Sequence, residues 1–177
     1  WDFIGNSPDP RPKFEPGYNS DGINHGTAIA GIIAAVGNNG KGISGVAFNA
    51  KIMPIRILSS NGEGDMSNLI TAIKYAVNNG ADIINLSLVG YDYSEESFKT
   101  IQWAKDKGVL IVVAAGNAES SSGGIDLNKT PSYPACYGNK SDNQLLLVAT
   151  SVDANEVKSK FANYGACVDV AALGENL

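Results

Sequence analysis

Residues 109–115, Val-Leu-Ile-Val-Val-Ala-Ala, contain no polar side chain. A strand that is apolar on both faces is typical of a parallel sheet covered by helices, because both faces of such a sheet are buried. Residues 67–79 have apolar side chains at helical spacing and are followed by Gly80, a common helix stop. Residues 94–107 form an amphipathic pattern with Ser94 as a plausible N-cap. This order of segments predicts an α/β fold.

Further segments extend the pattern in both directions. The small apolar residues 26–36 predict a buried helix. Four other apolar runs predict strands, at residues 51–58, 82–88, 145–152 and 168–172. We therefore expect three α/β/α layers around a mostly parallel sheet. Sites in such folds form where strands end, which directs attention to the loops after Leu58, Leu88 and Ala115.

Composition excludes several kinds of function. The length of 177 residues suits one domain, and the 13 basic residues are scattered under a net charge of −5. Nucleic acid is therefore not an expected partner. The apolar runs are too short to cross a bilayer, so no membrane span is expected. A single histidine and two cysteines that do not form a CxxC pair argue against a zinc site.

His25 begins the predicted helix at 26–36. A histidine at a helix N-terminus faces the positive end of the helix dipole, which favours the neutral imidazole. A general base must be neutral, so His25 is a candidate for that role. The alternative is a histidine with a purely structural role.

Asn117 follows the apolar strand 109–115 after a glycine. At the carboxyl edge of a sheet, its amide NH₂ group could donate a hydrogen bond to a developing oxyanion. The alternative is an ordinary Gly-Asn turn. Two further segments, residues 85–90 and 62–64, could expose backbone that takes up an extended peptide as an added strand.

Together these segments resemble the subtilase family of serine peptidases. The similarity rests on motifs that occur in the family's order across nearly the whole chain. They are His-Gly-Thr-x-x-Ala-Gly at 25–31, Gly-Ile-x-Gly-Val-Ala at 42–47, Asp-Ile-Ile-Asn-Leu-Ser-Leu at 82–88, Ala-Ala-Gly-Asn at 114–117, Tyr-Pro-Ala at 133–135, Val-Ala at 148–149 and Phe-Ala-Asn-Tyr-Gly at 161–165.

The resemblance implies a set of roles. His25 would be the general base and Asn117 the oxyanion donor. Because the pocket for the residue before the scissile bond would contain no acidic side chain, it should prefer uncharged residues. Val89 stands where the family more often has glycine in the segment that binds the substrate backbone, and it should narrow the adjoining pocket. The implied substrate-binding residues are Leu58, Gly62, Glu63, Gly64, Met66, Ser87, Leu88 and Val89, with Ala114, Ala115 and Gly116 lining the pocket.

The resemblance also implies two missing motifs. The family's Asp motif normally precedes a segment like Trp-Asp-Phe at 1–3, and its Gly-Thr-Ser-Met-Ala motif follows a strand like 168–172. We therefore expect residues 1–177 to be a partial peptidase domain, inactive alone, whose partners are a polypeptide substrate and the remaining segments of its own domain. A non-catalytic peptide-binding pseudoenzyme is the alternative. A dinucleotide-binding domain is a remote alternative function, because the Gly-x-Gly-x-x-Gly motif at 40–45 follows a predicted helix, whereas a phosphate-binding motif follows a strand.

Structural calcium is a further implication, since oxygen-rich loops suit this ion. One candidate loop offers Asp2, Asp9 and Asp21. Another offers Val36, Asn39, Lys41 and Ile43, together with ligands from outside the chain. Solvated polar loops are the alternative for both. The resemblance also places Cys136 beside Cys167, which predicts a disulfide and hence a secreted protein or another oxidising compartment.

Overall fold

The computed structural model describes residues 1–14, 16, 18, 20–118, 123–138 and 145–176, and all of their side chains except those of residues 20 and 21. The chain divides into two compact units, Trp1–Ala72 and Ile73–Leu177. Within the described ranges, no helix is long and apolar enough to cross a membrane.

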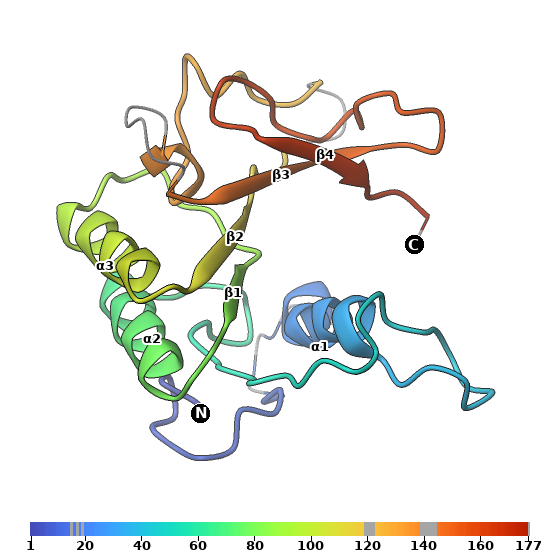
Figure 1. The fold of residues 1–177 in the computed structure, drawn as a ribbon, viewed down its shortest axis with the longest axis vertical. Helices are drawn as coiled ribbons and strands as arrows, with labels where there is room; N and C mark the ends of the chain where they lie inside the picture. Colours follow the sequence, from blue (N-terminus) through green and yellow to red (C-terminus); the bar gives the residue numbers. More distant parts are fainter. Residues whose placement is uncertain (15, 17, 19, 119–122, 139–144, 177) are drawn as a thin grey trace. The chain divides into compact units, whose positions relative to one another are not determined.

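A parallel sheet forms the centre of the second unit (Figure 1). Its strands are β1 (Ile83–Leu86), β2 (Leu110–Ala114), β3 (Leu147–Val152) and β4 (Val170–Leu173), and they lie in the order of the sequence. Each neighbouring pair is parallel. The predicted α/β class with a parallel sheet is therefore confirmed, and the carboxyl ends of β1 and β2 lie side by side.

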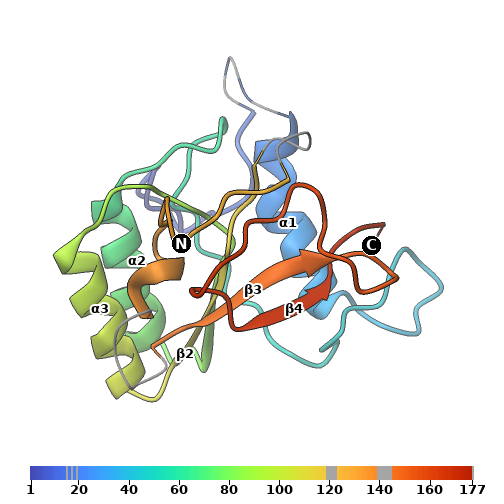
Figure 2. The ribbon, with the colours of Figure 1, turned by 90° about the horizontal axis from the view of Figure 1, so that it is seen from above.

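Helix α3 (Glu95–Asp106) packs against β2. Its start was correctly predicted, because the Ser94 hydroxyl accepts a hydrogen bond from the Ser97 N–H at 3.2 Å. Ile101 of α3 and Ile111 of β2 are both fully buried, and they belong to the core. Helix α2 (Met66–Asn78) precedes β1, and its second half lies beside α3 in both views (Figures 1 and 2).

Helix α1 (Ser20–Ala34) begins earlier than the sequence suggested. His25 is therefore inside the helix instead of at its N-terminus. The dipole acts mainly on the first turn, so the argument that it keeps His25 neutral was wrong. The prediction of a buried helix was wrong as well: Ile23 is buried, whereas Ala28 and Ile32 are exposed.

The predicted strand at residues 51–58 is reduced to one bridge, in which Arg56 pairs with Asp2. The Arg56 N–H donates to the Trp1 carbonyl at 2.9 Å, and the Phe3 N–H donates to the Arg56 carbonyl at 2.8 Å. The pairing continues at Pro54 only through its carbonyl, which accepts from the Trp1 N-terminal amine at 2.9 Å, because proline has no N–H to donate.

Candidate active site

The end of β2 presents Asn117 on the surface. Ala115 is buried, Gly116 has a φ of +92°, and Asn117 is exposed. Only glycine adopts this φ at little cost, so Gly116 turns the chain outward at this point. Asn117 forms an isolated bridge with Ala162. The oxyanion candidate thus lies at the carboxyl edge of the sheet on a backbone that is tied to a neighbouring segment.

Asn163 is almost fully buried and forms hydrogen bonds with the backbone at the end of β2. Its Nδ2 donates to the Ala115 carbonyl at 3.1 Å, and its backbone N–H donates to the Gly116 carbonyl at 3.0 Å. Its Oδ1 accepts from the Ile125 N–H at 2.9 Å. Sequence analysis assigned no role to Asn163, since its partner Ala115 is 48 residues away and no local pattern links the two residues. We describe it as a positioning residue.

The chain after β1 runs past the same point. Leu86 is paired with Val113 in the sheet register, and three residues further on Val89 lies against Gly116. Gly90 is paired with Tyr133 through backbone hydrogen bonds of 2.7 and 2.8 Å. The predicted peptide-binding segment (residues 87–89) and the predicted pocket wall (residues 114–116) therefore do lie together in the second unit.

The remaining candidate residues belong to the first unit, Trp1–Ala72. His25 is exposed on α1, and Leu58 is partly exposed. Met66 is also partly exposed, as the first residue of α2. His25 and Asn117 are in different units, so their convergence on one substrate carbonyl stays a prediction.

Residues 59–64 form a tight turn in the first unit. The Ser59 N–H donates to the Glu63 carbonyl at 2.7 Å, so this carbonyl already has an intramolecular partner. A Cβ atom on Gly64 would lie 2.4 Å from the Ile57 carbonyl oxygen, which explains the glycine there. Gly62, Glu63 and Gly64 are all exposed. Their exposure is compatible with the predicted role in peptide binding, which remains a prediction.

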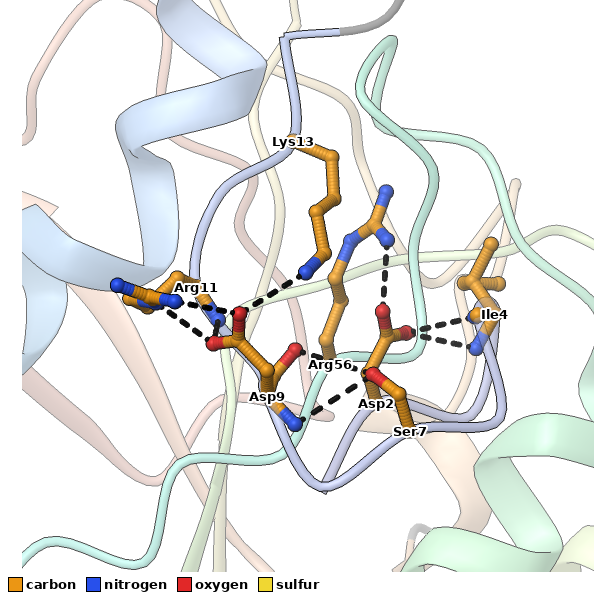
Figure 3. A network of polar contacts seen from close by, with 8 residues as sticks. Asp2, Ile4, Ser7, Asp9, Arg11, Lys13 and Arg56 are labelled. Carbon is orange, nitrogen blue, oxygen red and sulfur yellow. Dashed lines mark hydrogen bonds and ion pairs between the residues drawn. The ribbon is translucent and has the colours of Figure 1, made fainter.

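Asp2 has several partners within the first unit (Figure 3). The residue is fully buried, and its Oδ2 accepts from the Arg56 guanidinium at 3.0 Å. Its Oδ1 accepts from the backbone N–H groups of Ile4 and Gly5, both at 2.9 Å. Burial raises the pKa of the Asp2 carboxyl, but these hydrogen bonds outweigh burial and hold the pKa below its ordinary value. The Asp2 carboxylate is thus neutralised by a cationic side chain of the same unit.

Asp9 has cationic partners too. Its carboxylate accepts from Arg11 at 2.8 Å and from Lys13 at 3.2 Å, and these hydrogen bonds, led by that of Arg11, lower its pKa. Figure 3 shows Asp9 directed at Arg11 and Lys13 while Asp2 is directed at Arg56. The side chain of Asp21 lies outside the described residues. Asp2 and Asp9 thus each have cationic side-chain partners within the chain, and calcium binding at Asp2, Asp9 and Asp21 stays a prediction.

The other predicted calcium loop, residues 36–43, contains no carboxylate. Asn39 Oδ1 accepts from the Lys41 N–H at 2.9 Å. Across the described ranges, no three His, Cys, Asp or Glu residues are grouped as a metal site would need. The carbonyls of Val36, Lys41 and Ile43 would need ligands from elsewhere to hold the ion.

Cys136 and Cys167 form a disulfide, with their Cα atoms 5.0 Å apart. The bond joins the segment that follows Tyr133 to the segment that precedes β4.

Comparisons with known proteins agree with these observations. The family model described as "Subtilase family" matches residues 6–177. Thermitase from Thermoactinomyces vulgaris is 38% identical over 174 residues, which are 98% of this chain and 54% of that protein. A thermophilic serine proteinase from Bacillus sp. (strain AK1) is 37% identical over 177 residues, which are 100% of this chain and 38% of that protein.

Among solved structures, one titled as proteases from Pseudoalteromonas arctica PAMC 21717 matches with a TM-score of 0.69 at 34% identity, covering 82% of this chain and 42% of that one. The chain thus spans about half the length, or less, of these relatives. The parallel sheet, the exposed Asn at the end of β2 and a family match over nearly every residue lead to one conclusion: this chain belongs to the subtilase family of serine peptidases.

Proposed function

We propose that the protein is a serine endopeptidase of subtilisin type that hydrolyses peptide bonds through a Ser-His-Asp triad. The observation that carries the proposal is the end of β2, where Asn117 is exposed at the carboxyl edge of the sheet on a backbone fixed by Asn163 and Ala162. His25 is the general base. The serine and the aspartate come from residues outside this chain, and residues 1–177 are a partial peptidase domain.

Each group then has one task in the reaction. His25 accepts the proton of the serine hydroxyl as its oxygen bonds to the substrate carbonyl carbon. The carbonyl oxygen becomes an oxyanion, to which the Asn117 amide donates a hydrogen bond. The protonated His25 gives its proton to the leaving amine when the peptide bond breaks, which leaves an acyl-enzyme. Water then attacks this ester, with His25 again accepting and returning the proton.

The substrate is an extended polypeptide. Residues 87–89 and 62–64 hold its backbone as an added strand, because exposed backbone groups next to a sheet pair readily with an extended chain. Residues 114–116 line the pocket for the residue before the scissile bond. The wall residues carry no charge, so the substrate residue before the scissile bond is uncharged. Leu58 and Met66 contribute to neighbouring subsites.

The Cys136–Cys167 disulfide supports a secreted protein or another oxidising compartment, because such bonds persist there.

Calcium at residues 36–43 stays a prediction, and it requires ligands from outside the chain. Isothermal titration of the protein with Ca²⁺ tests it, and the absence of binding heat contradicts it.

The direct test is labelling with a serine-directed fluorophosphonate. The protein with its flanking segments is expected to be labelled covalently. The His25→Ala variant is expected to lose most of the labelling, since its serine has no base. Residues 1–177 alone are expected to remain unlabelled. If the longer protein is not labelled while its melting transition is cooperative, a peptide-binding pseudoenzyme is the correct reading.

A further inference from the structure

Asparagine precedes glycine at three places in the chain, at residues 39–40, 61–62 and 79–80. An asparagine in this position is prone to spontaneous deamidation, because the glycine has no side chain to shield its backbone nitrogen. This nitrogen loses its proton and bonds to the carboxamide carbon, and the amide nitrogen leaves as ammonia. One water molecule then opens the cyclic imide to aspartate or isoaspartate. The structure treats the three sites differently.

Asn79 and Gly80, which follow α2, are held against this reaction. Asn79 Nδ2 donates a hydrogen bond to the Tyr75 carbonyl at 2.8 Å. The Gly80 N–H donates to the Val77 carbonyl at 3.2 Å. The leaving nitrogen and the attacking nitrogen thus both have partners, and the reaction must first break these hydrogen bonds.

Asn61 and Gly62, in the turn at residues 59–64, are restrained in a similar way. The Gly62 N–H donates to the Ser59 carbonyl at 3.1 Å. Asn61 Nδ2 donates to the Glu63 carboxylate at 3.1 Å, and Asn61 Oδ1 accepts from the Ser59 hydroxyl. Here too the attacking nitrogen and the carboxamide are both engaged.

Asn39 and Gly40 are arranged in the opposite way. Both residues are exposed, and neither the Gly40 N–H nor Asn39 Nδ2 forms a hydrogen bond with any residue that the structure describes. Asn39 Oδ1 accepts from the Lys41 N–H at 2.9 Å, which folds the carboxamide back along the backbone that follows it and polarises its C=O bond. A Cβ atom on Gly40 would meet no atom within 4 Å beyond its chain neighbours, so the imide ring has room to form.

We propose that Asn39 is a site of spontaneous deamidation in the folded protein, whereas the fold protects Asn61 and Asn79 from the same reaction. The modification introduces a negative charge into residues 36–43, which contain no carboxylate. Its isoaspartate product also lengthens the main chain of this loop. Because the reaction needs only the asparagine, the N–H that follows it and water, it does not depend on the proposed function.

The test is incubation of the longer protein in mildly alkaline buffer, after treatment with the fluorophosphonate to prevent self-digestion. Peptide mapping by mass spectrometry then measures asparagine, aspartate and isoaspartate at the three sites in one sample. We expect Asn39 to convert at least about 5-fold faster than Asn61 or Asn79, since one hydrogen bond of about 1 kcal/mol corresponds to that factor in rate. Asn39→Gln should remove the main acidic form that ion exchange separates.

The matched control is the same protein unfolded in urea, where the three Asn-Gly pairs lose their hydrogen bonds. Their rates should then become similar, because only the dipeptide sequence is left to set them. Conversion of Asn61 or Asn79 as fast as that of Asn39 in the folded protein overturns the inference. The same order of rates in urea as in the folded protein overturns it as well, because the order would then not come from the fold.

Discussion

Replacing Arg56 by Met removes the one side-chain cation that contacts Asp2 in the described structure. The Arg56 guanidinium lies 3.0 Å from the Asp2 carboxylate, with side-chain exposures of 11% and 0%. Breaking a buried pair by removing one partner costs about 3–5 kcal/mol, because it leaves an uncompensated charge. The N–H groups of Ile4 and Gly5 still bind the carboxylate. We therefore expect a loss of about 3 kcal/mol, near the lower end of that range.

The loss should depend on pH in a defined direction. The pKa of Asp2 is lowered in the folded protein, so the pair contributes stability above the unfolded pKa and loses it as the pH falls through the folded value. The difference between Arg56→Met and the wild type should therefore be largest at neutral pH and should shrink in acid. Urea unfolding of the longer protein between pH 7 and pH 3 measures it.

Arg11→Met is the matched control. The side chain of Arg11 is 83% exposed, and its partner Asp9 is 36% exposed. Solvent screens such a pair, so little change is expected. Added Ca²⁺ should not restore the Arg56→Met variant if the loop is built for an internal cation. Equal effects of the two substitutions, or full rescue by Ca²⁺, would refute the account of this loop.

Two other predictions concern the second unit. Replacing Cys136 and Cys167 by Ala should lower the unfolding free energy by about 3–4 kcal/mol, because the disulfide closes a separation of 31 residues; a chemical melt with an unchanged midpoint contradicts this. Asn163→Ala should cost about 1–3 kcal/mol by calorimetry, because the Ile125 N–H loses its Asn163 partner, whereas the Ala115 carbonyl keeps the hydrogen bond from the Ser132 hydroxyl. A variant as stable as wild type would remove Asn163 from the positioning scheme.

The sequence predicted the elements that depend on local pattern. The apolar run at 109–115 became β2, and Ser94 caps α3 as expected. Helix α1 was placed too late because its continuous run of small and apolar residues starts only after Thr27, whereas the backbone is helical from Ser20 through mostly polar residues. The misplaced helix start also invalidated the dipole argument for His25, because that argument assumed that His25 lies at the N-terminus of the helix.

Contacts between residues that are far apart in the sequence could not be predicted from such local patterns. A carboxylate in a polar loop suits calcium and a guanidinium equally well, and Asp2 is 54 residues from Arg56. Asn163 belongs to a family motif, but its hydrogen bonds to the end of β2 depend on how residues 161–164 fold back on the sheet. Such contacts are set by tertiary structure, and spacing along the chain carries no signal for them.

The role of Asn117 is tested most directly by steady-state kinetics of Asn117→Ala in the longer protein, with a peptide that has an uncharged residue before the scissile bond. Loss of one oxyanion donor lowers kcat by roughly 10²–10³-fold and leaves KM nearly unchanged, because the oxyanion exists only in the transition state. We predict this result. A kcat within about 3-fold of the wild type, well short of that loss, would contradict the assignment of Asn117 and the active site built around it.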